Sequence, residues 1–210
     1  MFAIFKREFK AYFQSVIGWL FVAALLAVYG LYFYVYNLMQ GYPYIYYSLS
    51  AITFILLIAV PILTMRSFAE DRKNKTDQLT LTAPVSIGKI VFGKYLAMVA
   101  VFTIDIAIFA ISPLILRAFG TVPMGESYIS ILAFWLYGCA SIAVGMFISA
   151  LTESQVIAAV LSFAALFISY MMGGITNVIS SSGNLLTKIL SCFDLYAPFD
   201  NFSGGTLSLI

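Results

Sequence analysis

Five long runs of apolar residues constrain this chain more than any other feature. The hydrocarbon core of a bilayer is about 30 Å thick, and about 20 apolar residues in an α-helix span it. Hydrophobic residues make up 62% of the 210 residues and charged residues only 10%, too little polar surface for a soluble domain. The sequence therefore predicts an all-α polytopic membrane protein with five transmembrane helices, at 16–36, 46–65, 95–116, 129–151 and 155–172.

The basic residues predict how these helices are oriented. All but two of the eleven Lys and Arg residues, Arg117 and Lys188, precede the first run or lie between the second and third. Short cytoplasmic segments carry such an excess of positive charge, so we expect a cytoplasmic N-terminus. Tyrosines cluster between Tyr29 and Tyr47, which is typical of a membrane interface and predicts an outer loop. We expect a single transmembrane domain over 1–210, with an extracytoplasmic tail at 173–210.

Residues 1–15 form an amphipathic pattern before the first run. Aromatic side chains recur there at three- and four-residue steps, and basic side chains fall on the other side. This pattern predicts a helix lying in the membrane interface. A plain basic anchor explains the charges but not the aromatic stripe.

The segment 66–94 mixes basic and acidic residues between two spans, so it is the predicted docking surface for a soluble partner. Within it, 88–95 reads GKIVFGKY and resembles the phosphate-binding pattern GxxxxGK[ST]. Tyr95 cannot provide the small hydroxyl that ligates Mg²⁺, so we expect no nucleotide site in this chain. The chain has no histidine and a net charge of +2, which argues against a metal site and against a nucleic-acid partner.

Two features lie inside the predicted spans. Asp105 falls near the bilayer midplane, where a carboxyl group is costly and marks a candidate for the translocation pathway. It is expected to be protonated, to bond a hydroxyl such as Thr103, or to face a cavity. Ser141, Gly145 and Ser149 form a ladder of small residues at four-residue spacing, which predicts close packing against another helix.

Three stretches together resemble the permease subunits of type-2 ABC exporters, in the branch that includes gliding-motility-associated and nitrous-oxide-reductase-maturation permeases. They are FAIFKREFKAYFQSVIGWL (2–20), TMRSFAEDRKNKTDQLTLTAPVSIGKIVFGKYLA (64–97) and FISALTESQVIAAVLSF (147–163). The first resembles the family's amphipathic elbow helix, the second its cytoplasmic coupling region, and the third its inner loop between the fourth and fifth spans.

The resemblance implies a permease in the bacterial cytoplasmic membrane, paired with a second copy or a paralogue. It also implies separate ATPase subunits that bind ATP and Mg²⁺ and drive export. The residues implied in contact with those subunits are Glu70, Asp71, Arg72, Thr76, Asp77, Gln78, Leu79, Leu81, Thr152 and Glu153. The family usually has a glycine where Lys75 stands and a glutamate where Gln78 stands, and it has a sixth span that would follow 202–207 (FSGGTL).

Three other classes compete with this interpretation. An intramembrane enzyme needs a nucleophile and a base at matching depth, and one aspartate without histidine makes that a poor fit, so we expect no enzymatic activity in this chain. A secondary, proton-coupled transporter remains open because of Asp105, although no internal repeat is visible. A non-transporting membrane assembly factor also remains open.

Overall fold

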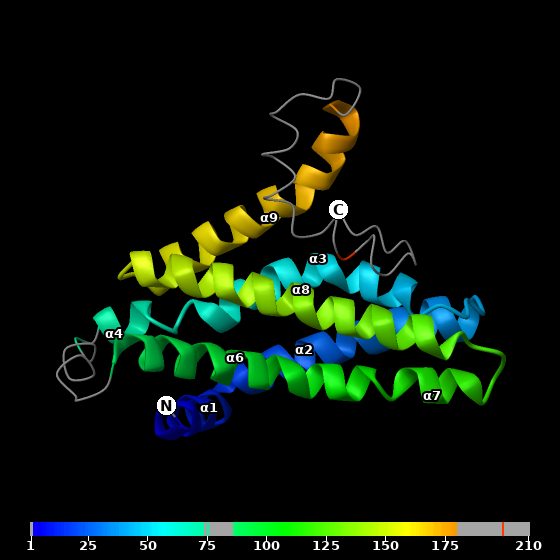
Figure 1. Cartoon of the computed structure of the whole chain (residues 1–210), viewed down its shortest axis with the longest axis horizontal. Coiled ribbons are helices and arrows are strands. Elements are labelled where there is room, and N and C mark those ends of the chain that lie inside the picture. Colours follow the sequence, from blue (N-terminus) through cyan, green and yellow to red (C-terminus); the bar gives the residue numbers. More distant parts are fainter. Residues whose placement is uncertain (1, 74, 76–85, 180–198, 200–210) are drawn as a thin grey trace.

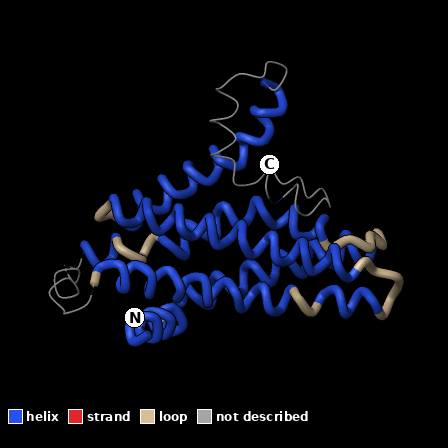
Figure 2. The backbone as a smooth tube through the Cα atoms, in the orientation of Figure 1, coloured by secondary structure: helices blue, strands red, loops and turns tan. Residues whose placement is uncertain are grey.

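The computed structural model of this chain describes residues 2–73, 75, 86–179 and 199. The described residues form helices joined by short turns, and none of them lies in a strand (Figure 2). The elements in chain order are α1 (Phe2–Gln14), α2 (Val16–Tyr32), the π-helix η1 (Phe33–Met39), α3 (Tyr46–Thr64), α4 (Ala69–Lys73), α6 (Ile87–Phe109), α7 (Ser112–Arg117), α8 (Met124–Leu151) and α9 (Gln155–Ile179).

Among the described residues, five helical stretches are long and apolar enough to cross a membrane. They are Val16–Met39, Tyr46–Lys73, Ile87–Arg117, Met124–Leu151 and Gln155–Met172. A helix satisfies its own backbone hydrogen bonds, which lipid cannot do. The prediction of an all-α, polytopic membrane protein with five spans is confirmed. The third and fourth helices begin several residues before the predicted spans, because their first turns carry polar residues that need not lie in hydrocarbon.

Four of the spanning helices form a bundle around α3. This helix packs against α2, α8 and α9, and α6 packs against α2 and α8. In Figure 1 these helices run side by side, and α9 starts beside the end of α8 and then diverges from the bundle. Apolar side chains of α9, among them Val156, Ile157 and Val160, are exposed among the described residues.

The bundle core is rich in aromatic rings where α2, α6 and α8 meet. Phe102 contacts Phe21 and Phe134 with ring centroids 6.5 and 6.0 Å apart, and all three side chains are fully buried. A Cβ atom at Gly138 would overlap the Phe102 ring. The glycine thus lets α8 approach α6 closely enough for the rings to interlock.

Helix α1 ends in a sharp bend and lies across the beginning of α6 (Figure 1). Ser15 has extended backbone angles, which break the helix between α1 and α2. A Cβ at Gly18 would overlap the backbone carbonyl of Tyr12, so the bend requires glycine there. The stripe Phe2, Phe5, Phe9 and Phe13 forms a continuous row of ring contacts along α1. The helix and its aromatic stripe are as the amphipathic pattern predicts, and its place in the membrane interface stays a prediction.

The first span ends in a π-helix that the sequence pattern did not predict. Asn37, on η1, is buried and donates hydrogen bonds from Nδ2 to the carbonyl oxygens of Tyr42 (2.8 Å) and Tyr44 (3.1 Å). It accepts one from the Ser48 hydroxyl at 2.5 Å. The amide side chain of Asn37 therefore links η1 to the loop and to the start of α3. Short π-helical turns often mark such special sites.

Candidate functional site

The short helix α4 and the turn between α8 and α9 lie together at the end of the bundle that carries α1. Arg72, Lys73 and Lys75 line a recess of about 620 Å³ together with Glu153, Ser154 and Gln155. Thr152 has extended backbone angles and ends α8. Two segments about 80 residues apart in the sequence thus form one surface, with three basic residues on one side and Glu153 on the other.

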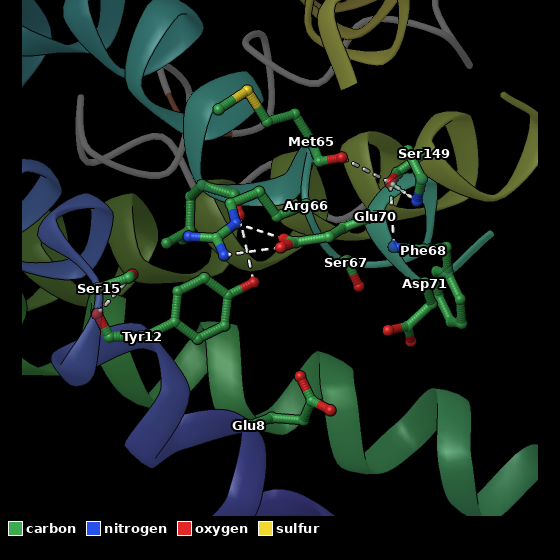
Figure 3. A network of polar contacts seen from close by, with 12 residues as sticks. Glu8, Tyr12, Ser15, Met65, Arg66, Ser67, Phe68, Glu70, Asp71 and Ser149 are labelled. Atoms are coloured by element: carbon green, nitrogen blue, oxygen red, sulfur yellow. Dashed lines mark hydrogen bonds and ion pairs between the residues drawn. The ribbon is translucent and has the colours of Figure 1, made fainter. Parts of the chain in front are cut away.

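A bidentate ion pair fixes the first turn of α4. Arg66 donates to Glu70 from Nε at 2.5 Å and from Nη2 at 2.9 Å (Figure 3). The pair spans four residues, and both side chains are about 30% exposed. The Glu70 carboxylate is therefore paired within the chain. The basic residues that follow it, Arg72, Lys73 and Lys75, are exposed.

Lys94 joins three elements at the same end. Its side chain, on α6, is only 4% exposed, and its Nζ lies 2.8 Å from Asp71 Oδ2 on α4 and 3.6 Å from Glu8 Oε1 on α1. It also donates to the carbonyl oxygen of Ser67 at 2.6 Å and lies over the Phe68 ring. A buried ammonium group is tolerated only with such compensation. Asp71 is therefore an anchor of α4 to α6.

The hydroxyl of Ser149 joins α8 to the turn before α4. It accepts hydrogen bonds from the backbone amides of Phe68 (3.2 Å) and Ala69 (3.3 Å), and it donates to the carbonyl oxygen of Met65 at 3.3 Å (Figure 3). The amides at the start of a helix have no partner within the helix, so this hydroxyl satisfies two of them. Helix α4 is thereby held by α8 as well as by α6.

The other two residues of the small-residue ladder differ in what they contact. A Cβ atom at Gly145 would overlap the Thr64 hydroxyl on α3, so the glycine sets the separation of α8 and α3 near the site. Ser141 is buried and donates to the carbonyl oxygen of Tyr137 in its own helix.

Helix α1 is tied to the end of α3 through Tyr12. Its hydroxyl donates to the carbonyl oxygen of Leu63 at 3.2 Å. Burial, and next the nearby Glu8 carboxylate, raise the pKa of this phenol above its usual range, so it remains a donor. Tyr12, Glu8, Arg66 and Lys94 line a polar cavity of about 440 Å³ between α1 and the start of α4.

Sequence reasoning missed Glu8 and Lys94 as members of this site. Lys94 lies on the stripe Ile90, Ala97 and Val101, all of them buried on α6. A basic residue in phase with a buried stripe is the signal that points to a paired, buried charge. The predicted contact residues Thr76, Asp77, Gln78, Leu79 and Leu81 lie outside the described residues.

The segment 88–95 that resembles a phosphate-binding loop is helical, because α6 starts at Ile87. The lysine in the place of the phosphate-binding lysine is the buried Lys94, whose ammonium group is paired with Asp71 and donates to the carbonyl oxygen of Ser67. Within the described part of the chain, no group of three Cys, Asp or Glu side chains lies close enough together to hold a metal ion.

Asp105 lies apart from this site, between Phe102 and Phe109 on α6. Its side chain is fully buried, and neither carboxyl oxygen has a hydrogen-bond partner among the described residues. The hydroxyl of Thr103 donates instead to the Val99 carbonyl at 2.7 Å and accepts from Trp135 Nε1 at 3.0 Å. The hydrogen bond to Thr103, one of the three alternatives for Asp105, is absent, because side chains two residues apart on a helix point to different sides.

Comparison with protein families gives one match, and no curated protein or solved structure matches the chain. The sequence model described as ABC-2 family transporter protein matches residues 33–203, which include α3, α4, α6, α8, α9 and both segments that line the recess. An all-helical protein with five spans, whose charged segments meet at one end of the bundle, agrees with that match. The chain belongs to the ABC-2 family of transporter proteins.

Proposed function

We propose that the chain is the permease subunit of an ATP-binding-cassette exporter, and that separate ATPase subunits dock on the recess between α4 and the α8–α9 turn. ATP and Mg²⁺ bind to those partner subunits. Their closure moves the spans and expels a substrate outward. Family membership supports the permease role, and the recess supports the docking site.

One observation carries this proposal: α4 is linked to three different spans. It follows α3 in the same helical stretch, it is bound to α6 by the Lys94–Asp71 pair, and it is bound to α8 through Ser149. A docking segment attached to one helix could swing without moving the others. A segment attached to three transmits a displacement to the bundle.

The proposal also assigns an environment and an assembly. The end that carries α1 and α4 faces the cytoplasm of a bacterial cell, since the basic residues concentrate there. The unit works as a pair of permease chains, identical or paralogous, because two ATPase subunits that close on each other need one docking recess each. The apolar side chains of α9 that are exposed among the described residues are available for contact with the second chain.

Charge reversal at the recess tests the docking. We expect the double variant Arg72→Glu and Lys73→Glu to lose co-purification with the ATP-binding-cassette ATPase encoded beside the gene. Arg117→Glu, a single charge reversal at an exposed position at the opposite end of the bundle, is the control and should keep the complex. A complex that survives the double reversal, or that the control disrupts equally, would refute the docking site.

A further inference from the structure

A long apolar groove runs between α1 and α6, away from the docking recess. It has a volume of about 630 Å³, and Phe2 and Phe5 of α1 form its wall at one end. The rest of its lining comes from a single stripe of α6 that includes Leu96, Ala100, Thr103 and Ala107. The side chains of Thr103 and Ala107 are exposed, so none of the described helices covers the end of the stripe that lies away from α1.

The groove has the direction and the length of one leaflet. Leu96 and Ala107 are separated by about 16 Å at 1.5 Å per residue, which is about half of a hydrocarbon core about 30 Å thick. Because α1 lies across the beginning of α6 (Figure 1), the groove starts below α1 and extends along α6 toward the midplane. A helix of another chain would cross the whole core, whereas an acyl chain of a phospholipid extends only to its middle.

Two exposed lysines lie on α1 close to the phenylalanines that line the groove. Lys6 follows Phe5 directly and lies one helical turn after Phe2, and Lys10 lies one turn further on. Both lysines are exposed, and neither forms an ion pair with an acidic residue in the described part of the chain. Glu8, which would cancel their charge, projects from the other side of α1 toward Lys94. The helix that forms one wall of the groove therefore carries two positive charges without an ion-pair partner among the described residues.

We propose that this groove binds an anionic phospholipid from the leaflet in which α1 lies. One acyl chain fills the groove along α6, and the headgroup contacts Lys6 and Lys10. The apolar lining selects a hydrocarbon chain, and the two lysines select a negative headgroup over a zwitterionic one. This site is independent of ATPase docking, because neither lysine lies at the recess.

The two tryptophans of the chain, Trp19 and Trp135, allow a direct test. Trp135 bonds Thr103 in the groove wall at 3.0 Å, so in a Trp19→Phe background its fluorescence reports bromine atoms on a nearby acyl chain. The protein is reconstituted in vesicles that mix phosphatidylglycerol and phosphatidylcholine, with either lipid brominated in turn. One lysine at an anionic membrane surface contributes about a fivefold preference, so we expect phosphatidylglycerol to be preferred at least about fivefold.

Two variants probe the two halves of the site. The double variant Lys6→Gln and Lys10→Gln should abolish the preference, while the double variant Arg72→Gln and Lys73→Gln, which removes the same two charges from α4, should keep it. Ala107→Phe should also reduce the preference, because the ring fills the groove while both lysines stay in place. Ala24→Phe, at an exposed position of α2, is its control and should not reduce the preference. Thermal unfolding of each variant checks that it is folded.

Three results would overturn the proposal. One is equal quenching by the two lipids in the starting protein. Another is a preference that survives loss of both lysines, or that falls equally in the double variant Arg72→Gln and Lys73→Gln. The third is a preference that Ala107→Phe leaves unchanged, which would mean that the lysines attract anionic lipid to the surface without a groove-bound chain.

Discussion

The ammonium group of Lys94 lies 2.8 Å from the carboxylate of Asp71, and the two residues are unequally buried. The lysine side chain is 4% exposed and the aspartate side chain 26% exposed. Water can reach one member of the pair but not the other. This inequality determines how the site responds when either partner is removed.

We expect Asp71→Asn to destabilise the protein more than Lys94→Met. Loss of the carboxylate leaves a buried ammonium group with Glu8 3.6 Å away, which costs about 2–3 kcal/mol. Loss of the lysine leaves a carboxylate that water can solvate, at a cost of about 1 kcal/mol. Denaturation midpoints of the purified protein measure both. Arg72→Gln, on the exposed side of α4, is the control, and equal effects of Asp71→Asn and this control would show that the pair is not formed.

Ser149→Ala should destabilise the protein by about 1–3 kcal/mol, because the amides of Phe68 and Ala69 lose their hydroxyl partner in a buried position. Ser141→Ala is a matched control on the same helix, since its hydroxyl bonds only a carbonyl of α8 itself. Its effect should stay below about 0.5 kcal/mol. Thermal unfolding of the two variants in one detergent gives the comparison, and equal shifts would contradict the role of Ser149.

Gly145→Ala should destabilise the protein, because the new methyl group overlaps Thr64 and forces α8 away from α3. Overpacking of this kind costs about 1–3 kcal/mol. Gly125→Ala, in the first turn of the same helix, meets no atom within 4 Å and should be neutral or mildly stabilising. The difference in melting temperature between these two variants is the measurement. A tolerated alanine at 145 would mean that the helices are not packed this closely.

Asp105→Leu should stabilise the protein, since the carboxyl group is buried without a hydrogen-bond partner among the described residues. Removing a buried polar group that has no hydrogen-bond partner raises the free energy of unfolding by about 1–3 kcal/mol. Asp105→Asn keeps the polarity and should give no such gain. Transport by the reconstituted complex is then compared with stability. A variant that is more stable but inactive would assign Asp105 to function, and a less stable leucine variant would show that the carboxyl group has a partner.

The sequence predicts much of the architecture because lipid imposes it. Backbone groups must be satisfied within helices, so apolar length alone locates the five spans, and the amphipathic stripe from Phe2 to Phe13 locates α1. The ends of the helices are less predictable. Helices such as α8, which starts at Met124, have a polar first turn that extends beyond the hydrocarbon. Hydropathy detects only the apolar part, so it does not locate such a start.

The site was less predictable because it depends on contacts between distant segments. The ladder of small residues predicts packing at Gly145, but nothing local shows that the Ser149 hydroxyl accepts two amides from the turn before α4. The distribution of charges predicts at which end of the bundle Lys94 lies. That Lys94 pairs with Asp71 and Glu8 depends on how α1 and α4 lie against α6. The π-helix, whose Asn37 side chain donates to two carbonyl oxygens of the following loop, likewise depends on the geometry of that loop.

The attachment of α1 has a consequence for how the chain is made. The partners of its two inward side chains are Leu63 for Tyr12 and Lys94 for Glu8, both of which leave the ribosome long after α1 itself. The first helix synthesised therefore cannot reach its final position until the start of the third span has been translated. Until then we expect the row of phenylalanines on α1 to hold the helix at the membrane surface.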